Sequence, residues 1–314
     1  MGRYNLLPVF FIISFLITEK SICAAWTQAK GEGQLILNVS GYKSNKYYDH
    51  DSRLQNSDID FQKLEVNPFF ELGITDNLTV GLNQTLQYWN FDNSASGSIN
   101  NIRQCDLSDS LNSGLIDSSN LNVFMTDAEI FARMQIYSND NFVISLQPLV
   151  KSPCLLFVNG YMQIPKNNID YEIRALVGWG FKWDPDIDIG FLKIPFAGQN
   201  HFINFETAYR KRSPRFADQL KFDATAGFRY QKDLLILAQM FSTFSAFNKN
   251  VEADSFNGMN TVIYEDDYYS VKAQISLVQQ MTKDTSVQLG MFHEVAGENA
   301  GRGTGMLLSL WYSF

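Results

Sequence analysis

The stretch Gly303-Thr304-Gly305-Met306-Leu307-Leu308-Ser309-Leu310-Trp311-Tyr312-Ser313-Phe314, at the carboxy terminus, decides the fold. Read with the period of two that a β-strand imposes, it places these apolar residues on one face: Met306, Leu308, Leu310, Tyr312 and Phe314. An apolar strand at a chain end leaves a sheet edge with which other chains can pair. A closed barrel in a lipid bilayer removes that edge, because the last strand pairs with the first and its apolar face meets hydrocarbon. The stretch therefore predicts the last strand of a transmembrane barrel, with the last strand of a soluble β-domain as the alternative.

The chain end also resembles the assembly signal of Gram-negative outer-membrane β-barrels, in which a terminal Phe follows aromatic or apolar residues at alternate positions. Phe314, Tyr312 and Leu310 carry this resemblance. It implies insertion by the barrel-assembly machinery. It also implies a place in the bacterial cell outer membrane, with lipid and lipopolysaccharide as neighbours.

The amino terminus has the features of an export signal. Arg3 precedes an apolar run from Leu6 to Ile17, which is too short for a membrane-spanning helix. The small residues Cys23-Ala24-Ala25 follow, so we expect residues 1–25 to be a signal peptide and residues 26–314 to form the barrel domain. The bulky Ile22 directly before Cys23 argues against a lipoprotein.

The composition suits strands that alternate lipid-facing and polar residues. Hydrophobic residues make up 45% of the 314 residues and aromatic residues 14%, whereas the mean hydropathy is slightly negative at −0.15. Aromatic girdles at the two membrane interfaces account for such an aromatic content. The net charge of −8 argues against nucleic acid as a partner. No linker rich in Pro and Gly divides the mature chain, so we expect one large β-domain.

Segments in which apolar and polar residues alternate recur along the mature chain. Examples are residues 63–72, 78–88, 127–136, 170–180, 220–230 and 269–277. Tight turns at Asp76, Asn139, Lys232 and Lys283 alternate with long polar connections, of which Asn90 to Asn120 is the longest. We count about twelve strands, and the short turns all fall on the periplasmic side if the first strand starts there. The prediction is an all-β, antiparallel, up-and-down transmembrane β-barrel.

Three connections carry further expectations. The polar segment from Lys43 to Asp60 and the segment from Gly297 to Gly303 are expected to link strands as external loops. The connection from Lys182 to Asn200 is too long for a periplasmic turn. It is either an extension of the flanking strands, a periplasmic flap, or a hairpin at Ile187 to Pro195 that raises the strand count to fourteen.

The polar faces of the predicted strands carry charges of both signs, which a barrel turns toward its lumen. The candidate lumen-lining residues are Glu129, Arg133, Glu172, Arg174, Glu206, Arg210, Asp223 and Arg229. One hypothesis is an ion-pair network that rigidifies the barrel. The other is a solute path in which a ladder of the four arginines faces the glutamates and orients a sugar or an anion.

Residues that could catalyse a reaction are few. The three histidines are His50, His201 and His293. His50 lies in a polar loop that cannot hold a base at hydrogen-bond distance from a nucleophile. His293-Glu294 lies at the outer end of a strand, where lipid-modifying barrel enzymes place their sites, yet no Ser or Asn follows at the required spacing. The sequence therefore predicts no enzyme, and neither a cofactor nor a metal site.

Two cysteines remain in the mature chain, Cys105 and Cys154, and both lie in predicted external loops. Export exposes them to an oxidising compartment, where a disulfide can form. The alternatives are a disulfide that ties the two loops together and two separate thiols.

Several segments resemble a poorly characterised group of outer-membrane proteins: Ala25–Gln28, Lys30–Gln34, Glu65–Thr75 and Asn204–Arg210. Some members are similar to proteins of the XagA type, which are linked to export of adhesive polysaccharide. Others resemble barrels associated with uptake of aromatic compounds. The resemblance covers most of the mature chain and implies the fold, but it identifies no catalytic residue.

The sequence supports three hypotheses about function. The first is a passive channel, or an export or uptake port, for a small polar or polymeric solute such as a polysaccharide. The second is a non-conducting barrel whose external loops mediate binding or adhesion. The third is an outer-membrane lipid hydrolase built around His293.

Overall fold

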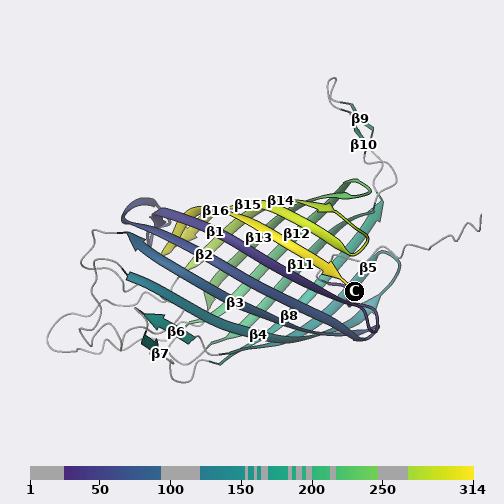
Figure 1. The fold of residues 1–314 in the computed structure, drawn as a ribbon, viewed down its shortest axis with the longest axis horizontal. Coiled ribbons are helices and arrows are strands. Elements are labelled where there is room, and N and C mark those ends of the chain that lie inside the picture. Colours follow the sequence, from purple (N-terminus) through teal and green to yellow (C-terminus); the bar gives the residue numbers. More distant parts are fainter. Residues whose placement is uncertain are drawn as a thin grey trace, which may run out of the picture.

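Figure 1 shows one β-barrel whose strands are strongly tilted. The computed structural model describes residues 25–92, 121–152, 155–158, 161–163, 169–182, 186–188, 193–195, 200–212, 217–246 and 268–314. No helix in this described part is long and apolar enough to cross a membrane.

Twelve antiparallel strands close the barrel. They are β1 (Gly33–Tyr48), β2 (Leu54–Thr75), β3 (Leu78–Asp92), β4 (Leu121–Ser138), β5 (Phe142–Lys151), β8 (Asp170–Lys182), β11 (Asn200–Lys211), β12 (Asp218–Gln231), β13 (Leu234–Ala246), β14 (Tyr269–Gln280), β15 (Thr285–Glu298) and β16 (Ala300–Ser313). Each pairs with the next, and β16 returns to pair with β1, so the predicted barrel of about twelve strands is confirmed. Most are longer than the ~9–11 residues that a tilted strand needs to cross a bilayer, so the barrel extends beyond the membrane.

Four short strands lie outside the barrel. Strand β6 (Leu155–Val158) pairs with the beginning of β4, and β7 (Tyr161–Gln163) pairs with β6. Strands β9 (Asp186–Asp188) and β10 (Lys193–Pro195) pair only with each other, as a separate hairpin. The hairpin at Ile187 to Pro195 therefore exists, but the fourteen-strand barrel is wrong, because strands of three residues cannot cross a membrane.

The connections sort into two sets at the two ends of the barrel. Residues 76–77, 139–141, 232–233 and 281–284 form turns at the end where the chain terminates, which we call the short-turn end. The other end, which we call the long-loop end, carries the remaining connections apart from the one that holds β9 and β10. The usual topology of such barrels places the short-turn end in the periplasm.

Two predicted loops are largely strand. Strand β1 continues to Tyr48 and β2 begins at Leu54, so only residues 49–53 connect them where Lys43 to Asp60 was expected. Likewise β15 and β16 are joined by Asn299 alone, whose φ of 48° is one that Asn tolerates, in place of the loop from Gly297 to Gly303. The backbone pairing continues in these strand ends. Their side chains are polar because both faces of the strands are in contact with water there. Of the predicted loop from Asn90 to Asn120, residues 93–120 lie outside the described residues.

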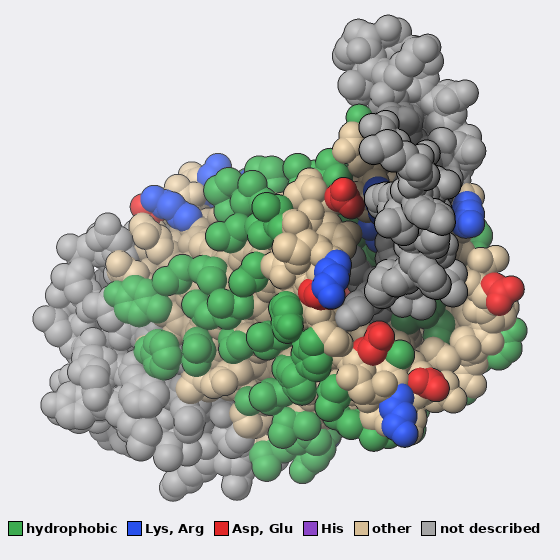
Figure 2. Space-filling view, turned by 45° about the vertical axis from the view of Figure 1, so that its right-hand side comes forward, with side chains coloured by type: hydrophobic (Ala, Val, Ile, Leu, Met, Phe, Trp, Pro, Cys, Tyr) green, Lys and Arg blue, Asp and Glu red, His purple; other side chains and the backbone are tan. Residues whose placement is uncertain are grey.

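An apolar belt covers the outside of the barrel. The face of β16 that the sequence predicts is exposed: Met306 keeps 63% of its surface and Leu308 54%. Equivalent residues on the other strands include Leu37, Leu64, Ile130, Phe205, Ile275 and Leu289. Hydrophobic side chains cover the middle of the face drawn in Figure 2, and charged side chains lie toward its two ends. This belt is the surface that meets lipid.

The last residue of the chain forms hydrogen bonds with the first residue of β1. The amide of Phe314 donates to Gly33 O at 3.1 Å, and the amide of Gly33 donates to Phe314 O at 3.0 Å. The Phe314 ring stacks on Phe70, with 6.2 Å between centroids, and on Tyr312. Reading this end as an assembly signal stays a prediction.

A charge on the apolar belt tests the orientation of the strands. We expect Leu308→Arg, at mid-strand, to lower the free energy of unfolding by about 2–4 kcal/mol, and Tyr312→Arg, near the strand end, by about 0–1 kcal/mol. Urea unfolding in liposomes measures both. Equal losses at the two positions would contradict the placement of Leu308 at the middle of the bilayer.

Candidate functional site

The lumen holds the candidate site, and one wall of it carries a cluster of charged side chains. We call this the ion-pair cluster; its members, from β4, β8, β11 and β12, are Glu129, Glu172, Arg174, Glu206, Arg210, Lys221 and Asp223. The alternation of the strands turns them inward, because their chain neighbours such as Ile130, Ile173 and Phe205 are exposed to lipid. Apart from Glu129, near the middle of β4, they lie in the half of their strands toward the long-loop end.

Glu172 is the centre of the cluster. Its carboxylate is wholly inaccessible and accepts from Arg210 Nε at 2.7 Å, Lys221 Nζ at 3.0 Å and Arg174 Nη2 at 2.9 Å. Arg210 lies directly across from Glu172 in the pairing of β8 with β11. With Arg174 Nε at 3.1 Å, four charge-assisted hydrogen bonds from three cations compensate for taking this carboxylate out of water.

The two arginines extend the cluster to the remaining acids. Arg174 Nη1 donates to Glu206 and, at 3.1 Å, to Asp223 Oδ2. Arg210 Nη2 donates to Glu129 Oε1 at 2.7 Å. Four carboxylates thus share three cations, which leaves this wall of the lumen with an excess of one negative charge.

The structure replaces the predicted arginine ladder with this mixed cluster. Arg174 and Arg210 lie among the carboxylates instead of facing them: the register of β8 with β11 places Arg210 opposite Glu172, and Arg174 lies between Glu172 on its own strand and the opposed pair Glu206 and Asp223 on β11 and β12. The other two predicted arginines lie elsewhere. Arg133 is near the short-turn end of β4, and Arg229 donates to the carbonyl of Lys232 in the turn after β12, at 3.1 Å.

Arg133 holds the segment before β1 inside the lumen. It forms an ion pair with Glu71 at 3.2 Å and donates to the Trp26 carbonyl at 3.0 Å and to Gln147 Oε1 at 3.0 Å. Ser145 Oγ donates to the Ala25 carbonyl at 2.6 Å. The first described residues of the chain are therefore fixed against β4 and β5.

Residues 26–31 cross the short-turn end of the lumen. The Trp26 ring lies against Gly178, where any larger residue would overlap it. The Gln28 amide donates to Thr79 Oγ1 at 2.8 Å, and its side chain donates to Glu71. The Gly31 amide donates to the Gly73 carbonyl at 2.9 Å. This arrangement was not predicted from the sequence, although Gly178 at an inward-facing strand position is a signal that space is left for a neighbour.

A buried apolar group lies at the same end of the barrel. Its members are Ile36, Phe202, Leu235, Leu237, Val278 and Trp311. Trp311 is 8% exposed, and its Nε1 has no hydrogen-bond acceptor among the described residues. The short-turn end of the lumen therefore combines this apolar group with the buried Arg133–Glu71 ion pair and the segment at residues 26–31.

The histidines do not form a catalytic arrangement in the described part of the chain. His50 lies in the exposed turn after β1, 3.7 Å from Asp51. His201 is buried between Phe181 and Phe228. His293 shares a hydrogen bond of 2.8 Å with Thr304 on the outer face. Within the described residues, no three His, Cys, Asp or Glu side chains converge as a metal site. Cys105 and Cys154, for which a disulfide and two separate thiols were the alternatives, lie outside the described residues.

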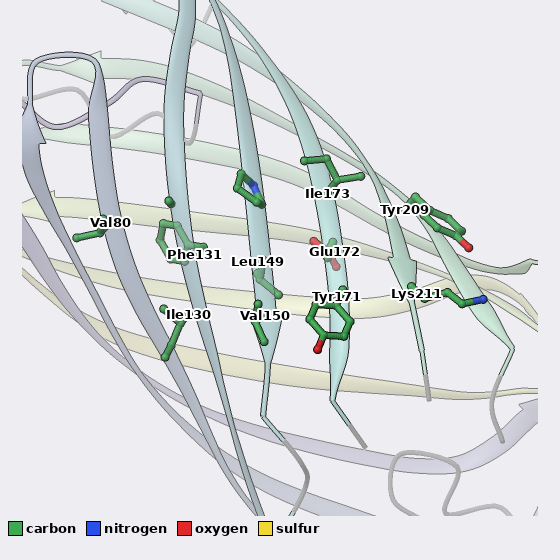
Figure 3. A pocket seen from close by; sticks show the side chains of 12 residues that line it. Val80, Ile130, Phe131, Leu149, Val150, Tyr171, Glu172, Ile173, Tyr209 and Lys211 are labelled. Carbon is green, nitrogen blue, oxygen red and sulfur yellow. The ribbon is translucent and has the colours of Figure 1, made fainter. Parts of the chain in front are cut away.

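A depression on the lipid-facing wall is lined mainly by residues of β4, β5 and β8 (Figure 3), and Pro148 is one of them. Proline lacks an N–H donor, and the pairing of β4 with β5 is interrupted there, between Phe131 opposite Leu149 and Met134 opposite Leu146. The lining is mainly apolar and includes Ile130, Val150, Tyr171 and Ile173. Because it opens toward the bilayer, it suits a lipid acyl chain better than a polar solute.

Neutralising the centre of the cluster tests its structural contribution. We expect Glu172→Gln to lower the free energy of unfolding by about 3–5 kcal/mol, because it leaves buried cations without their shared anion. The matched control is Asp51→Asn in the exposed turn, whose pairing with Arg53 is worth at most about 1 kcal/mol. Urea unfolding of both variants gives the comparison, and equal effects would show that the cluster adds nothing to stability.

The start of the mature chain stays a prediction, with cleavage expected before Trp26. Intact mass spectrometry of the exported protein, without any tag at its amino terminus, measures this directly. A mass that starts at another residue would contradict the expectation.

Comparison with known proteins supports the fold. No family model matches the chain, and no curated protein matches its sequence. The outer membrane channel COG4313 from Pseudomonas putida F1 has a TM-score of 0.60 at 12% identity, over 93% of this chain and 98% of that one. The β domain of the Bordetella autotransporter BrkA has a TM-score of 0.49 at 9% identity, over 91% and 100% of the two chains. The KdgM porin has a TM-score of 0.43 at 10% identity, over 89% and 99%.

The likeness to the COG4313 channel concerns the fold, and the resemblance to proteins of the XagA type stays a prediction. The closed barrel and its apolar belt agree with that fold. The chain is a twelve-stranded β-barrel of the bacterial outer membrane.

Proposed function

We propose that the protein is a passive channel that lets a polar solute cross the outer membrane. The observation that carries the proposal is the ion-pair cluster on the lumen wall, in the half toward the long-loop end. If the interior served only to stabilise the barrel, apolar side chains would suffice, because they often replace buried ion pairs without loss of stability. Charged groups on the wall can instead form hydrogen bonds with a solute, and these replace the hydrogen bonds of its hydration shell.

The segment at residues 26–31 gives the channel a closable end. It precedes β1 and is not a strand of the barrel, so its displacement breaks no pairing between strands. Hydrogen bonds to β2, β3, β4 and the turn at Asp76 hold it, among them the bonds of Arg133 and Gln28, and these must break before the segment moves. Movement of this segment would connect the charged half of the lumen with the periplasm.

A non-conducting barrel is the second candidate function. The apolar group around Trp311 and the segment at residues 26–31 together favour it, because both occupy the short-turn end of the lumen. In that case the external loops would carry the function by binding or adhesion. Assembly by the barrel-assembly machinery and contact with lipopolysaccharide belong to either candidate.

Conductance in planar bilayers tests the channel. We expect small or intermittent current steps from the refolded protein, and larger, longer steps from the double variant Arg133→Met with Glu71→Gln. The double variant frees the segment at residues 26–31 without leaving an unpaired buried charge. Arg53→Ala, in the exposed turn after β1, is the control for loss of an arginine.

Folding must be verified before the currents are interpreted. A mobility that changes on heating in gels shows that each protein is a folded barrel. Silence from both the wild type and the double variant, in protein shown to be folded, would refute the channel and favour the non-conducting barrel.

A further inference from the structure

Aromatic side chains line part of the lumen, although closure of the barrel does not require them. We call the group the aromatic arc; it consists of Phe241 on β13, Phe292 on β15, Tyr42 on β1, Phe61 on β2 and Trp89 on β3. Trp89 is 8% exposed whereas its neighbour Tyr88, on the lipid side, is 43% exposed. Each member lies in the half of its strand toward the long-loop end. The interior of a conducting barrel is ordinarily polar, so these rings need another explanation.

The rings form an almost continuous surface. Phe292 and Tyr42 are nearly parallel, with centroids 6.1 Å apart and planes at 4°. Tyr42 meets Phe61 at 6.0 Å, and Phe61 meets Trp89 edge to face at 5.5 Å. These distances are those of favourable aromatic pairs.

Two glycines of the terminal strand make this surface possible. Phe292 and Tyr42 lie on β15 and β1, on either side of β16. A Cβ atom at Gly305 would overlap the Phe292 ring, and one at Gly303 would overlap the Tyr42 ring. The rings therefore reach each other across the bare backbone of β16.

Hydrogen-bond donors flank the aromatic arc. Lys272 Nζ lies 4.8 Å from the centroid of Phe241 and 5.1 Å from that of Phe292. Within the described residues, Lys272 has no carboxylate within ion-pair distance and no hydrogen-bond acceptor. Ring faces stabilise an ammonium group partly, but its three N–H donors still require acceptors. Lys63 Nζ lies 5.8 Å from the Tyr42 centroid and 3.0 Å from Glu65 Oε2.

Hydrogen-bond acceptors flank the same rings. Glu65 Oε2 accepts from Gln87 Nε2 at 2.6 Å as well as from Lys63, which fixes this carboxylate beside the arc. Glu294 Oε2 accepts from the Gly303 amide at 3.0 Å. An ionised carboxylate has about four acceptor positions, so both keep capacity for a further donor. The two lysines and two glutamates cancel in charge.

We propose that the aromatic arc binds a saccharide ring, an inference that rests on the proposed channel and names its substrate class. A pyranose presents an apolar C–H face that stacks on aromatic rings, and hydroxyl groups at its edge that both donate and accept. The arc supplies that pairing, with Lys272 as donor and the carboxylates of Glu65 and Glu294 as acceptors. The balanced charge does not favour an aromatic anion, and the charged flanks do not favour a hydrocarbon.

The position of the arc places it on the solute path. In the strand pairing Asp223 of the ion-pair cluster lies opposite Phe241, which in turn lies opposite Lys272. The charged wall and the aromatic arc therefore adjoin at one level of the lumen. A saccharide on the arc would therefore lie beside Asp223, the member of the ion-pair cluster that pairs with Phe241.

Isothermal titration calorimetry of the refolded barrel tests the proposal. The detergent must carry no sugar headgroup, for example an amine oxide, because a maltoside would compete. The probes are maltotriose, cellotriose and digalacturonate, with benzoate as the aromatic anion. We expect at least one of the saccharides to bind, and Phe61→Ala to weaken its binding by about tenfold. Phe222→Ala, on the lipid-facing side of β12, is the matched control and should bind as the wild type does.

Further measurements separate the outcomes. Lys272→Met should also weaken the saccharide, and heat-modifiable mobility verifies that each variant is folded. Absence of binding by all three saccharides, or tighter binding of benzoate, would overturn the saccharide proposal. Salt conductance in planar bilayers is measured in parallel on the same protein. Conductance without saccharide binding refutes only the saccharide site, whereas saccharide binding without conductance refutes only the channel.

Discussion

Every backbone N–H and C=O group that crosses hydrocarbon needs a partner within the protein, and this requirement governs the whole chain. The pairing of β1 with β16 meets it for the two strands that would otherwise be edges. Closure depends on reciprocal bonds between Gly33 and Phe314 and on a register that matches apolar faces, such as Leu37 opposite Leu310. Once the ring is closed, the alternation of side chains assigns every residue either to lipid or to the lumen.

Because the lumen side chains are not constrained by the lipid, their chemical character differs along the length of the barrel. The ion-pair cluster around Glu172 occupies one wall toward the long-loop end, and the aromatic arc occupies the adjoining wall. Toward the short-turn end, Trp26 and the apolar group around Trp311 lie inside the barrel. A polar solute entering from the long-loop end would therefore meet the charged and aromatic walls first and the segment at residues 26–31 afterwards. This order fits the proposed channel.

The barrel was predictable because its main signal is local. The period of two from Met306 to Phe314 predicts which side chains face lipid. The alternation of short and long connections predicts the number of strands. The contacts inside were not predictable, because they depend on the register between strands far apart in sequence. Arg210 lies opposite Glu172 because β11 pairs with β8 in one particular register. The alternation of side chains predicts that each residue faces the lumen, but it does not predict which residue lies opposite which. The burial of Ala25 was missed for the same reason, since its contacts come from β5 and β8.

The central claim is that charged groups of the lumen line the path of the solute, and ion selectivity tests it most directly. The measurement is the reversal potential in a planar bilayer under a salt gradient, for Lys221→Gln and Glu206→Gln beside the wild type. Loss of a cation from a conducting path favours cations, and loss of a carboxylate favours anions. The account predicts shifts in opposite directions for the two variants. Reversal potentials identical to that of the wild type, with conductance intact, would show that ions bypass the cluster and would contradict the account.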